Sequence, residues 1–325
     1  MEKNIKELIT QDCISKVKEL YGIEQVIEIG GFENFILGYH KDNENYILRI
    51  THSSHRNLEQ VQAEIDWINF LDNKGISVSK PIKSCNGHYV EKINLNDSYF
   101  IVTSFIKAKG NHITRNDFND SLLENYGAII GKMHRVTKEY QDEKKRRYRF
   151  DEEPIIVMAK EITKDDKFLT KLNDLVQYLQ SLPIDKDSFG LIHNDVHIGN
   201  FFVENHDLTI FDFDDCIYTH FISDIAIALF YHIMFIKNEE ERKKRAISFL
   251  KPFMNGYKKE NYLAPYWLKQ LPYFLKLREY ILYLVINRDL DVKTSKFGEF
   301  FLDIYQQRIN EDIPFVDLDF TEVCK

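Results

Sequence analysis

The stretch LIHNDVHIGNFFVENHDLTIFDFDDCIY, residues 191–218, places three histidines, three asparagines and several aspartates among apolar, strand-like runs. FFV and LTIF are each typical of a β-strand, and ENHD at 204–207 reads as a tight turn between them. A turn centred at 205–206 would place Asn200 and Asp212 nearly opposite each other, roughly 5 Å apart. One amide oxygen and one carboxylate would then face a common point, and hard oxygen ligands of this kind suit Mg²⁺.

The composition is that of an ordinary globular protein with an acidic balance. Of the 325 residues, 44% are hydrophobic and 29% are charged, while an aromatic content of 14% predicts a large core. The 43 Lys and Arg residues against 51 Asp and Glu residues give a net charge of -8. Nucleic acids and anionic membranes both bind basic surfaces, so this balance argues against either as the main partner. The sequence gives no indication of the oligomeric state.

Cysteine spacing and apolar runs predict a cytoplasmic protein. The four cysteines are far apart and form no CxxC pair, which is typical of free thiols in a reducing compartment. The start, MEKNIKELIT, lacks the apolar core of a signal peptide. The longest apolar run, at 225–236, is too short to span a bilayer and suits a buried helix.

The pattern of predicted elements changes near residue 105. Before it we expect about five strands and one long internal helix at 57–74, preceded by a helical pattern at 3–21. A polar, turn-like segment at about 104–110 is the predicted hinge, and helical patterns dominate from residue 117 onward. The sequence therefore predicts a small sheet-rich lobe at 1–105 and a larger helical lobe at 106–325, with a ligand site in the cleft between them.

The polar residues of the opening stretch follow a recognisable spacing. His193, Asp195, His197 and Asn200 match the HxDxHxxN loop of the aminoglycoside phosphotransferase and choline kinase superfamily, which includes homoserine-kinase-like and spore-coat-kinase-like members. Asp212 in IFDFDD resembles the family's metal-binding aspartate, the counterpart of the DFG aspartate of protein kinases.

The resemblance extends over roughly residues 25–260. Further matching segments are the glycine hairpin GGFEN (30–34), the strand YILRI (46–50), Glu64 in the next helix, the helix GKMHR (131–135) and the helix start SDIA (223–226).

This resemblance implies a two-lobed, protein-kinase-like α+β fold. The N-lobe at 1–105, with a small antiparallel sheet and one long helix, would bind the nucleotide, and the larger, mostly helical C-lobe at 106–325 would be the catalytic and acceptor-binding lobe. It implies transfer of the γ-phosphate of ATP, with GTP left open, to a hydroxyl of an aminoglycoside-, choline- or homoserine-like small molecule. Asp195 would orient the acceptor hydroxyl, and Asn200 and Asp212 would bind Mg²⁺.

The N-lobe residues would bind the nucleotide. Main-chain groups around Gly30 and Gly31 would approach the phosphates, because glycine lacks a Cβ. Arg49 would contact the α- and β-phosphates with Glu64 as its partner, although protein kinases have lysine at that position. Adenine would bind main-chain groups near Ser104 and Ile106.

Four other interpretations compete with this one. A Ser/Thr protein kinase needs an activation segment, but SDIA follows Asp212 after only 11 positions. A haloacid-dehalogenase-type phosphatase would use Asp212 as a covalent nucleophile, which leaves the upstream segments unexplained. A catalytically silent nucleotide-binding protein would not need the intact Asp195. HNDVH as a zinc cluster lacks a further ligand set at a convincing spacing.

The remaining polar residues carry more modest expectations. His193 and His197 are predicted to brace the loop, and Asp224 to cap a helix or brace the loop. Asn194, where the family usually has glycine, tolerates a left-handed backbone. The basic run KKRRYR at 144–149 is read as a solvated loop rather than an acceptor site. Arg278 and Glu279, in an aromatic helical segment, are noted as polar contacts of an acceptor pocket but not assigned to the site.

Overall fold

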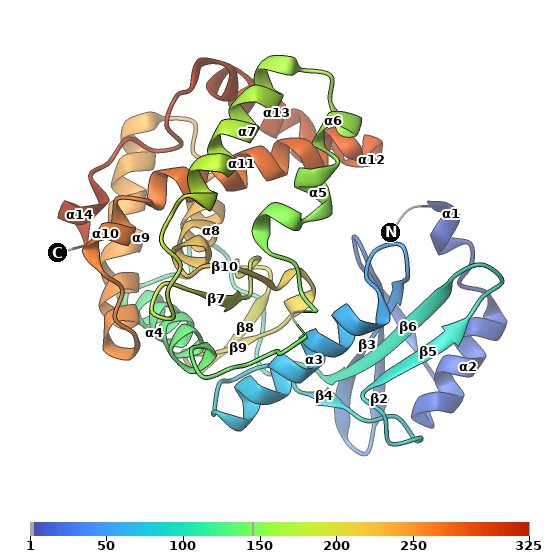
Figure 1. Ribbon diagram of the computed structural model, residues 1–325. Helices are drawn as coiled ribbons and strands as arrows, with labels where there is room; N and C mark the ends of the chain where they lie inside the picture. The colour runs from blue at the N-terminus through green and yellow to red at the C-terminus, as the bar shows by residue number, and fades with distance from the viewer. Residues whose placement is uncertain (1–2, 145, 325) are drawn as a thin grey trace. The chain divides into compact units, whose positions relative to one another are not determined.

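The computed structural model describes residues 3–144 and 146–324 (Figure 1). These divide into two compact units: unit 1 is drawn from 1–111, 140–147 and 209–214, and unit 2 from the intervening segments and the C-terminal part. The sequence placed a single boundary at residue 105. The structure places the first boundary after Asn111 instead, and two later segments return to unit 1. No helix within the described residues is long and apolar enough to cross a membrane.

Unit 1 is built on an antiparallel sheet of six strands, against the roughly five expected. Its order is β1-β2-β3-β6-β4, with β5 also pairing with β6. The two-residue strand β4 was not expected from the sequence, because so short a strand leaves no periodic signal. The strands are β1 Ile27–Gly30, β2 Phe35–Lys41, β3 Glu44–His52, β4 Pro81–Ile82, β5 Val90–Asn94 and β6 Tyr99–Ile106.

The helices of unit 1 are α1 Lys3–Lys6, α2 Gln11–Tyr21 and α3 Leu58–Asn73. Helix α2 ends at Gly22, whose φ of 59° is the left-handed conformation that glycine favours at a C-terminus. Helix α3 begins with a capping box, in which the Asn57 side chain accepts from Gln60 N–H and the Gln60 side chain accepts from Asn57 N–H. Buried residues of α2 pack with the sheet in one core, which includes Val17, Leu48 and Phe100.

Unit 2 is mainly helical, as expected. Strands β7 Phe189–Ile192 and β10 Ile217–His220 pair antiparallel. Strand β8 Phe201–Glu204 precedes β9 Asp207–Ile210, and the unit boundary after Leu208 falls within β9. The longer helices are α4 Asp120–Thr137, α7 Asp166–Gln180, α8 Ile222–Ile233, α9 Glu239–Glu260, α11 Leu271–Arg288 and α13 Lys296–Glu311. The short ones are η1 Phe150–Glu152, α5 Pro154–Val157, α6 Ala159–Ile162, α10 Pro265–Leu268, α12 Leu290–Lys293 and α14 Phe320–Val323. The short helix η2 Phe213–Asp215 begins in unit 1 and ends at the first residue of the following unit 2 segment.

Glycines allow α4 and α9 to pack with their backbones in close approach. A Cβ on Gly127 would lie 1.8 Å from the carbonyl oxygen of Phe253, and one on Gly256 would lie 1.8 Å from that of Glu124. Any side chain at either position would force the helices apart. This packing places His134, near the end of α4, beside Tyr257 of α9.

Candidate active site

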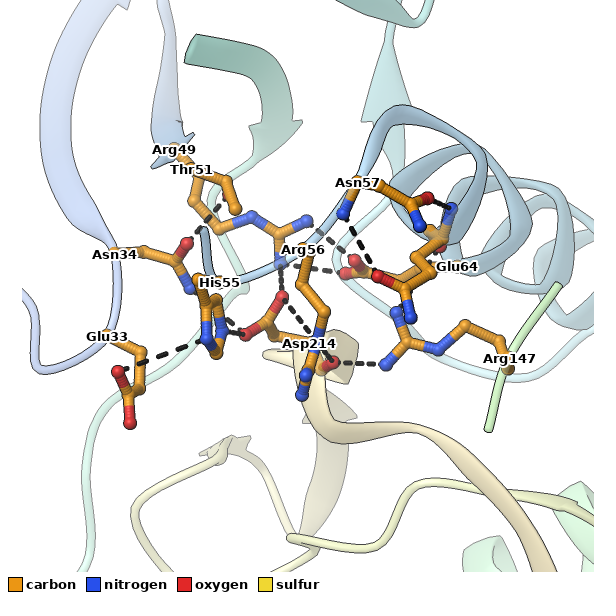
Figure 2. Close-up of polar contacts among 11 residues, drawn as sticks. Glu33, Asn34, Arg49, Thr51, His55, Arg56, Asn57, Glu64, Arg147 and Asp214 are labelled. Atoms are coloured by element: carbon orange, nitrogen blue, oxygen red, sulfur yellow. Dashed lines mark hydrogen bonds and ion pairs between the residues drawn. The ribbon is translucent and has the colours of Figure 1, made fainter. Parts of the chain in front are cut away.

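Unit 1 contains the expected cation and carboxylate pair. Arg49 on β3 donates to both carboxylate oxygens of Glu64 on α3, with Nη1–Oε1 at 2.8 Å and Nη2–Oε2 at 2.6 Å (Figure 2). Arg49 is 3% exposed and Glu64 is fully buried. The planar guanidinium matches the carboxylate in a two-point geometry that a lysine ammonium cannot reproduce. The pairing predicted from the sequence is present, while its contact with phosphate stays a prediction.

Asp214, to which the sequence analysis gave no role, is the centre of a larger network in unit 1. Its carboxylate accepts from His55 Nε2 at 2.6 Å and from Asn34 Nδ2 at 3.2 Å, and it lies 3.8 Å from Arg49 Nη1 (Figure 2). Burial would raise the pKa of this carboxyl. The positive groups of His55, Arg56 and Arg49 outweigh burial and hold the pKa well below its usual value.

The main chain of Asp214 is bound as tightly as its side chain. Its carbonyl oxygen accepts from Arg56 Nε at 3.2 Å and also from Arg147 Nη2. Arg147 Nη1 donates to the carbonyl oxygen of Gln60 at 3.3 Å, and the residue is 3% exposed. The basic run at 144–149 is therefore not simply a solvated loop, since it supplies a buried structural cation. Lys145 of that run lies outside the described residues.

The glycine hairpin has the backbone that its sequence suggests. Gly30 and Gly31 both have φ of 124°, a region that side chains disfavour. A Cβ on Gly31 would lie 2.1 Å from the carbonyl oxygen of Asn34, so this position requires glycine. Asn34 in turn accepts a hydrogen bond from Thr51 and donates to Asp214. The hairpin is thus tied to the segment that follows Asp212.

The predicted adenine contacts already have partners in unit 1. Ser104 is fully buried, and its hydroxyl contacts Tyr39 at 2.8 Å. The N–H of Ile106 donates to the Lys80 carbonyl at 2.8 Å, and its carbonyl accepts from Ser79 Oγ at 2.5 Å. A role for these two positions in binding adenine stays a prediction.

In unit 2, the loop 193–200 is braced by Asp224 at the start of α8. The Asp224 carboxylate accepts from the N–H of Asn194 at 2.8 Å and from that of His193 at 3.2 Å. His134 of α4 contacts the same carboxylate at 3.0 Å. Asp224 is therefore a loop brace, as predicted. Asn194 has φ of 64°, the left-handed conformation expected for it.

Asp195 projects from this braced loop and is held at both carboxylate oxygens. Asn200 Nδ2 donates to Oδ2 at 2.9 Å and also to the Asp195 carbonyl at 2.8 Å. Arg278 Nη2, from helix α11, donates to Oδ1. The side chain of Asp195 is 18% exposed, so the carboxylate is fixed but not enclosed.

Two positive groups determine the charge of Asp195. Burial would raise the pKa of its carboxyl, but His197, 3.4 Å from Oδ2, and Arg278 lower the pKa below its ordinary value. His197 is therefore more than a loop brace, because its ring faces the carboxylate. Arg278, which sequence reasoning mentioned but did not assign, is a direct partner. An ion pair 83 residues apart along the chain leaves no local sequence signal.

The proposed metal ligands belong to different units. The turn expected at 205–206 is present, with φ of 51° at Asn205 and 72° at His206. The unit boundary follows Leu208, so Asn200 belongs to unit 2 and Asp212 to unit 1. Their convergence on one ion stays a prediction.

The chemistry of these ligands fits a hard cation. Asp212 is an exposed carboxylate with φ of 64°, an uncommon backbone for a residue with a side chain. Carboxylate and amide oxygens suit Mg²⁺ or Ca²⁺. Among the described residues no group of three or more His, Cys, Asp and Glu side chains is arranged to bind a metal, which gives the zinc-cluster alternative no support.

Comparison with known proteins agrees with this arrangement. The model of the phosphotransferase enzyme family matches residues 26–263. Amicoumacin kinase from Bacillus subtilis (strain 168) is 32% identical over 331 residues, covering 99% of this chain and 98% of that protein.

Solved structures show the same fold. The amicoumacin kinase hAmiN in complex with AMP-PNP, Ca²⁺ and Ami superposes with a TM-score of 0.90 at 32% identity, covering 99% of this chain and 100% of that one. A microcompartment-associated aminopropanol kinase superposes with a TM-score of 0.72 at 17% identity, covering 92% and 99%.

These matches exclude the haloacid-dehalogenase and protein-kinase alternatives and confirm the kinase-like α+β fold. The chain belongs to the phosphotransferase enzyme family, and it is a small-molecule phosphotransferase with a hydroxyl group as acceptor.

Proposed function

We propose that this protein transfers the γ-phosphate of ATP to a hydroxyl group of amicoumacin or of a small molecule closely similar to it. The observation that carries the proposal is the full-length match to amicoumacin kinases, at 32% identity and a TM-score of 0.90. That match includes the C-terminal helices, beyond the residues matched by the family model. Structures of aminoglycoside- and choline-modifying kinases share less than 20% identity with this chain, so they support the fold and not those acceptors.

Asp195 is the proposed catalytic residue. Its carboxylate accepts a hydrogen bond from the acceptor hydroxyl and orients the oxygen in line with the γ-phosphorus. The acceptor oxygen forms a bond to that phosphorus, the bond to the bridging oxygen of ADP breaks, and the hydroxyl proton leaves through Asp195 to solvent. Asn200 supports this geometry, because its Nδ2 donates to the carboxylate at 2.9 Å. Such orientation is the main catalytic contribution in phosphoryl transfer.

Binding of the nucleotide is assigned to unit 1. Arg49 supplies positive charge for the phosphates, and Glu64 fixes the plane of its guanidinium. The main chain at Gly30 and Gly31 allows a close approach of phosphate. We assign the adenine to main-chain groups next to Ser104 and Ile106, since the groups of Ile106 itself already have partners. ATP is favoured over GTP because the solved relative contains AMP-PNP.

Asn200 and Asp212 would bind the divalent cation, which when present neutralises charge on the β- and γ-phosphates. Both offer hard oxygen ligands, for which Mg²⁺ and Ca²⁺ compete through size and coordination number. Asn200 would bind through its amide oxygen, since its nitrogen donates to Asp195. We propose Mg²⁺ as the working ion.

A transfer assay tests the function directly. The purified protein is incubated with ATP, Mg²⁺ and amicoumacin, with choline, homoserine and an aminoglycoside in parallel reactions. We expect mass spectrometry to show one phosphate added to amicoumacin, at a kcat/KM at least tenfold higher than for any other acceptor. The Asp195→Ala variant serves as the blank. Equal or higher kcat/KM with one of the other acceptors would overturn the proposed substrate while leaving the reaction class intact.

A further inference from the structure

Arg278 connects Asp195 to a small cavity in unit 2. This cavity has a volume of about 10 Å³, enough for about one water molecule or one group of that size. Its lining includes Asn194, the residue before Asp195, together with Arg278 on α11 and Thr219 on β10. The rest of the wall is largely apolar and comes from residues such as Ile227 and Phe274.

Two lining residues bring buried polar atoms that have no hydrogen-bond partner within the described part of the chain. They are Nε of Arg278 and Oγ1 of Thr219. Thr219 is 1% exposed, so solvent does not satisfy its hydroxyl. A buried polar group without a hydrogen-bond partner destabilises the fold. A ligand group that pairs with both atoms would remove that cost.

The guanidinium of Arg278 is fixed on its other edge. Nη2 donates to Asp195 Oδ1 and, at 2.5 Å, to the hydroxyl of Tyr231 on α8. The guanidinium carbon also lies 5.0 Å from the centre of the Tyr231 ring. That ring packs in turn against His197, with centroids 4.4 Å apart. The side chain of Arg278, which lines the cavity, therefore has little freedom to move.

Charge balance indicates which group the cavity accepts. The positive charge of Arg278 is matched by the carboxylate of Asp195. Together these two groups therefore offer no excess positive charge to an anionic group. A neutral oxygen, such as that of an amide, ester or hydroxyl, can accept from Arg278 Nε and pair with the Thr219 hydroxyl. The volume of about 10 Å³ suits that single oxygen rather than a larger group.

We propose that this cavity is a specificity subsite for a neutral oxygen of the acceptor, and that Arg278 is the positioning residue that couples its occupancy to the orientation of Asp195. One edge of the guanidinium fixes the carboxylate, and the other binds the acceptor. This inference rests on the proposed phosphotransfer from ATP, but it does not require amicoumacin to be the acceptor.

Two variants of Arg278 test its contact with Asp195 separately from its proposed contact with the acceptor. Arg278→Ala removes both contacts, so we expect kcat for phosphoryl transfer to fall about 10²-fold through misplacement of Asp195, and KM for the acceptor to rise about tenfold. Arg278→Lys retains a cation for Asp195 but lacks Nε. It should recover much of kcat while KM for the acceptor stays raised. Millimolar guanidinium should restore part of kcat in the alanine variant only.

Variants of Thr219 test the proposed role of the cavity without removing a contact of Asp195. Thr219→Val keeps the shape but removes the hydroxyl, so we expect KM for the acceptor to rise about 3- to 10-fold with kcat and KM for ATP unchanged. Thr219→Ser should behave as the wild type. Lys276→Ala on the same helix α11, which removes a partly exposed ion pair with Asp312, is the matched control and should leave all constants unchanged.

The outcomes distinguish this inference from the proposed function. If wild type phosphorylates amicoumacin and the variants of Arg278 and Thr219 keep KM and kcat within twofold, the inference is wrong and the function stands.

If wild type does not accept amicoumacin, the slow hydrolysis of ATP by water is measured instead. Arg278→Ala should then lower hydrolysis about 10²-fold while Thr219→Val leaves it unchanged, and equal rates would overturn the role of Arg278. Melting temperatures within a few degrees of wild type show that each variant is folded.

Discussion

Asp214 in unit 1 and Asp195 in unit 2 are both aspartates bound by arginine, yet they differ in how completely their surroundings enclose them. Asp214 is 5% exposed, and both its carboxylate and its carbonyl oxygen receive donors. The side chain of Asp195 is 18% exposed and receives donors from Asn200 and Arg278. Positive neighbours lower the pKa of both carboxyls despite burial.

We infer that this difference separates a structural carboxylate, Asp214, from the carboxylate proposed to be catalytic, Asp195. Every contact of Asp214 described above comes from its own unit, and these contacts fix the chain two residues after Asp212. Enclosure of this kind leaves little surface for a substrate. Asp195 is equally well oriented, but part of it stays accessible. A group that must receive a substrate hydroxyl needs both properties, because orientation without access gives no reaction.

The largest expected effect is the loss of the accessible carboxylate. Asp195→Asn keeps the size of the side chain but removes the charge and one acceptor oxygen. We expect kcat for transfer to fall about 10²–10⁴-fold, while the affinity for ATP, measured by calorimetry, stays within twofold. Asp207→Asn, an exposed aspartate after the β8–β9 turn, is the control. A normal rate for Asp195→Asn would remove the catalytic assignment.

A smaller but still large effect is expected for the buried pair in unit 1. Glu64→Ala leaves the guanidinium of Arg49 buried without its two-point partner, which costs about 3–5 kcal/mol of stability. Thermal unfolding should show a clear fall in Tm, and transfer should slow less than in the Asp195 variant. Glu59→Ala, exposed on the same helix, should change Tm little.

The double variant Arg49→Met with Glu64→Leu sharpens this test. Replacing a buried ion pair by apolar residues of similar size is often neutral, so Tm should return toward that of the wild type while transfer does not. Recovery of both would show that Arg49 stabilises the fold but does not bind phosphate.

The two sites also differ in how much of them the sequence could predict. Motifs predicted the positions of Asp195, Asn200 and Glu64. Asp195 and Asn200 lie in the same loop, and Glu64 lies on the helix that follows the strand of its partner Arg49. The contacts of Arg278 and Arg147 join segments 83 and 67 residues apart. No periodicity records such a pairing, and an arginine that serves as a buried cation looks in sequence like one in a solvated run.

The elements themselves were predicted better than their grouping. The helix expected at 57–74 is α3, and its capping residue Asn57 is the signal that places its start. The boundary at 105 missed that 140–147 and 209–214 return to unit 1. These two segments belong to unit 1 because of tertiary contacts, such as that of Phe213 with Trp67, whose ring centroids are 5.4 Å apart. Local propensity contains no information about them.

The next effect in size is expected for Arg147. Its neighbour Arg146 provides the comparison. Arg147→Met removes the donors to the carbonyls of Asp214 and Gln60, and hydrogen bonds from a charged group contribute about 1.5–3 kcal/mol. Arg146→Met removes ion pairs with Asp142 and Asp66, for which we expect at most about 1 kcal/mol. Denaturant unfolding of both variants measures the difference. Equal losses would contradict the structural role of Arg147.

Glu279, next to Arg278, shows what happens to a buried carboxyl that lacks the donors of Asp195 and Asp214. It is fully buried, and neither carboxylate oxygen has a hydrogen-bond partner within the described residues. Burial raises the pKa of Glu279 from 4.5 to about 8, although Arg308, Lys276 and Arg242 oppose the change. Between these two pH values the folded state keeps a proton that the unfolded state has lost.

Stability should therefore fall as pH rises through that window and level off above pH 8, with a slope of at most about 1.4 kcal/mol per pH unit from this one group. Glu279→Gln, which is always neutral, should lose this dependence and be more stable than the wild type at pH 8 but not at pH 5. Glu299→Gln, exposed on α13, should follow the wild type. A Glu279→Gln curve parallel to that of the wild type would mean that the carboxyl is ionised in the fold, and that a buried carboxyl here needs no arginine to hold its charge.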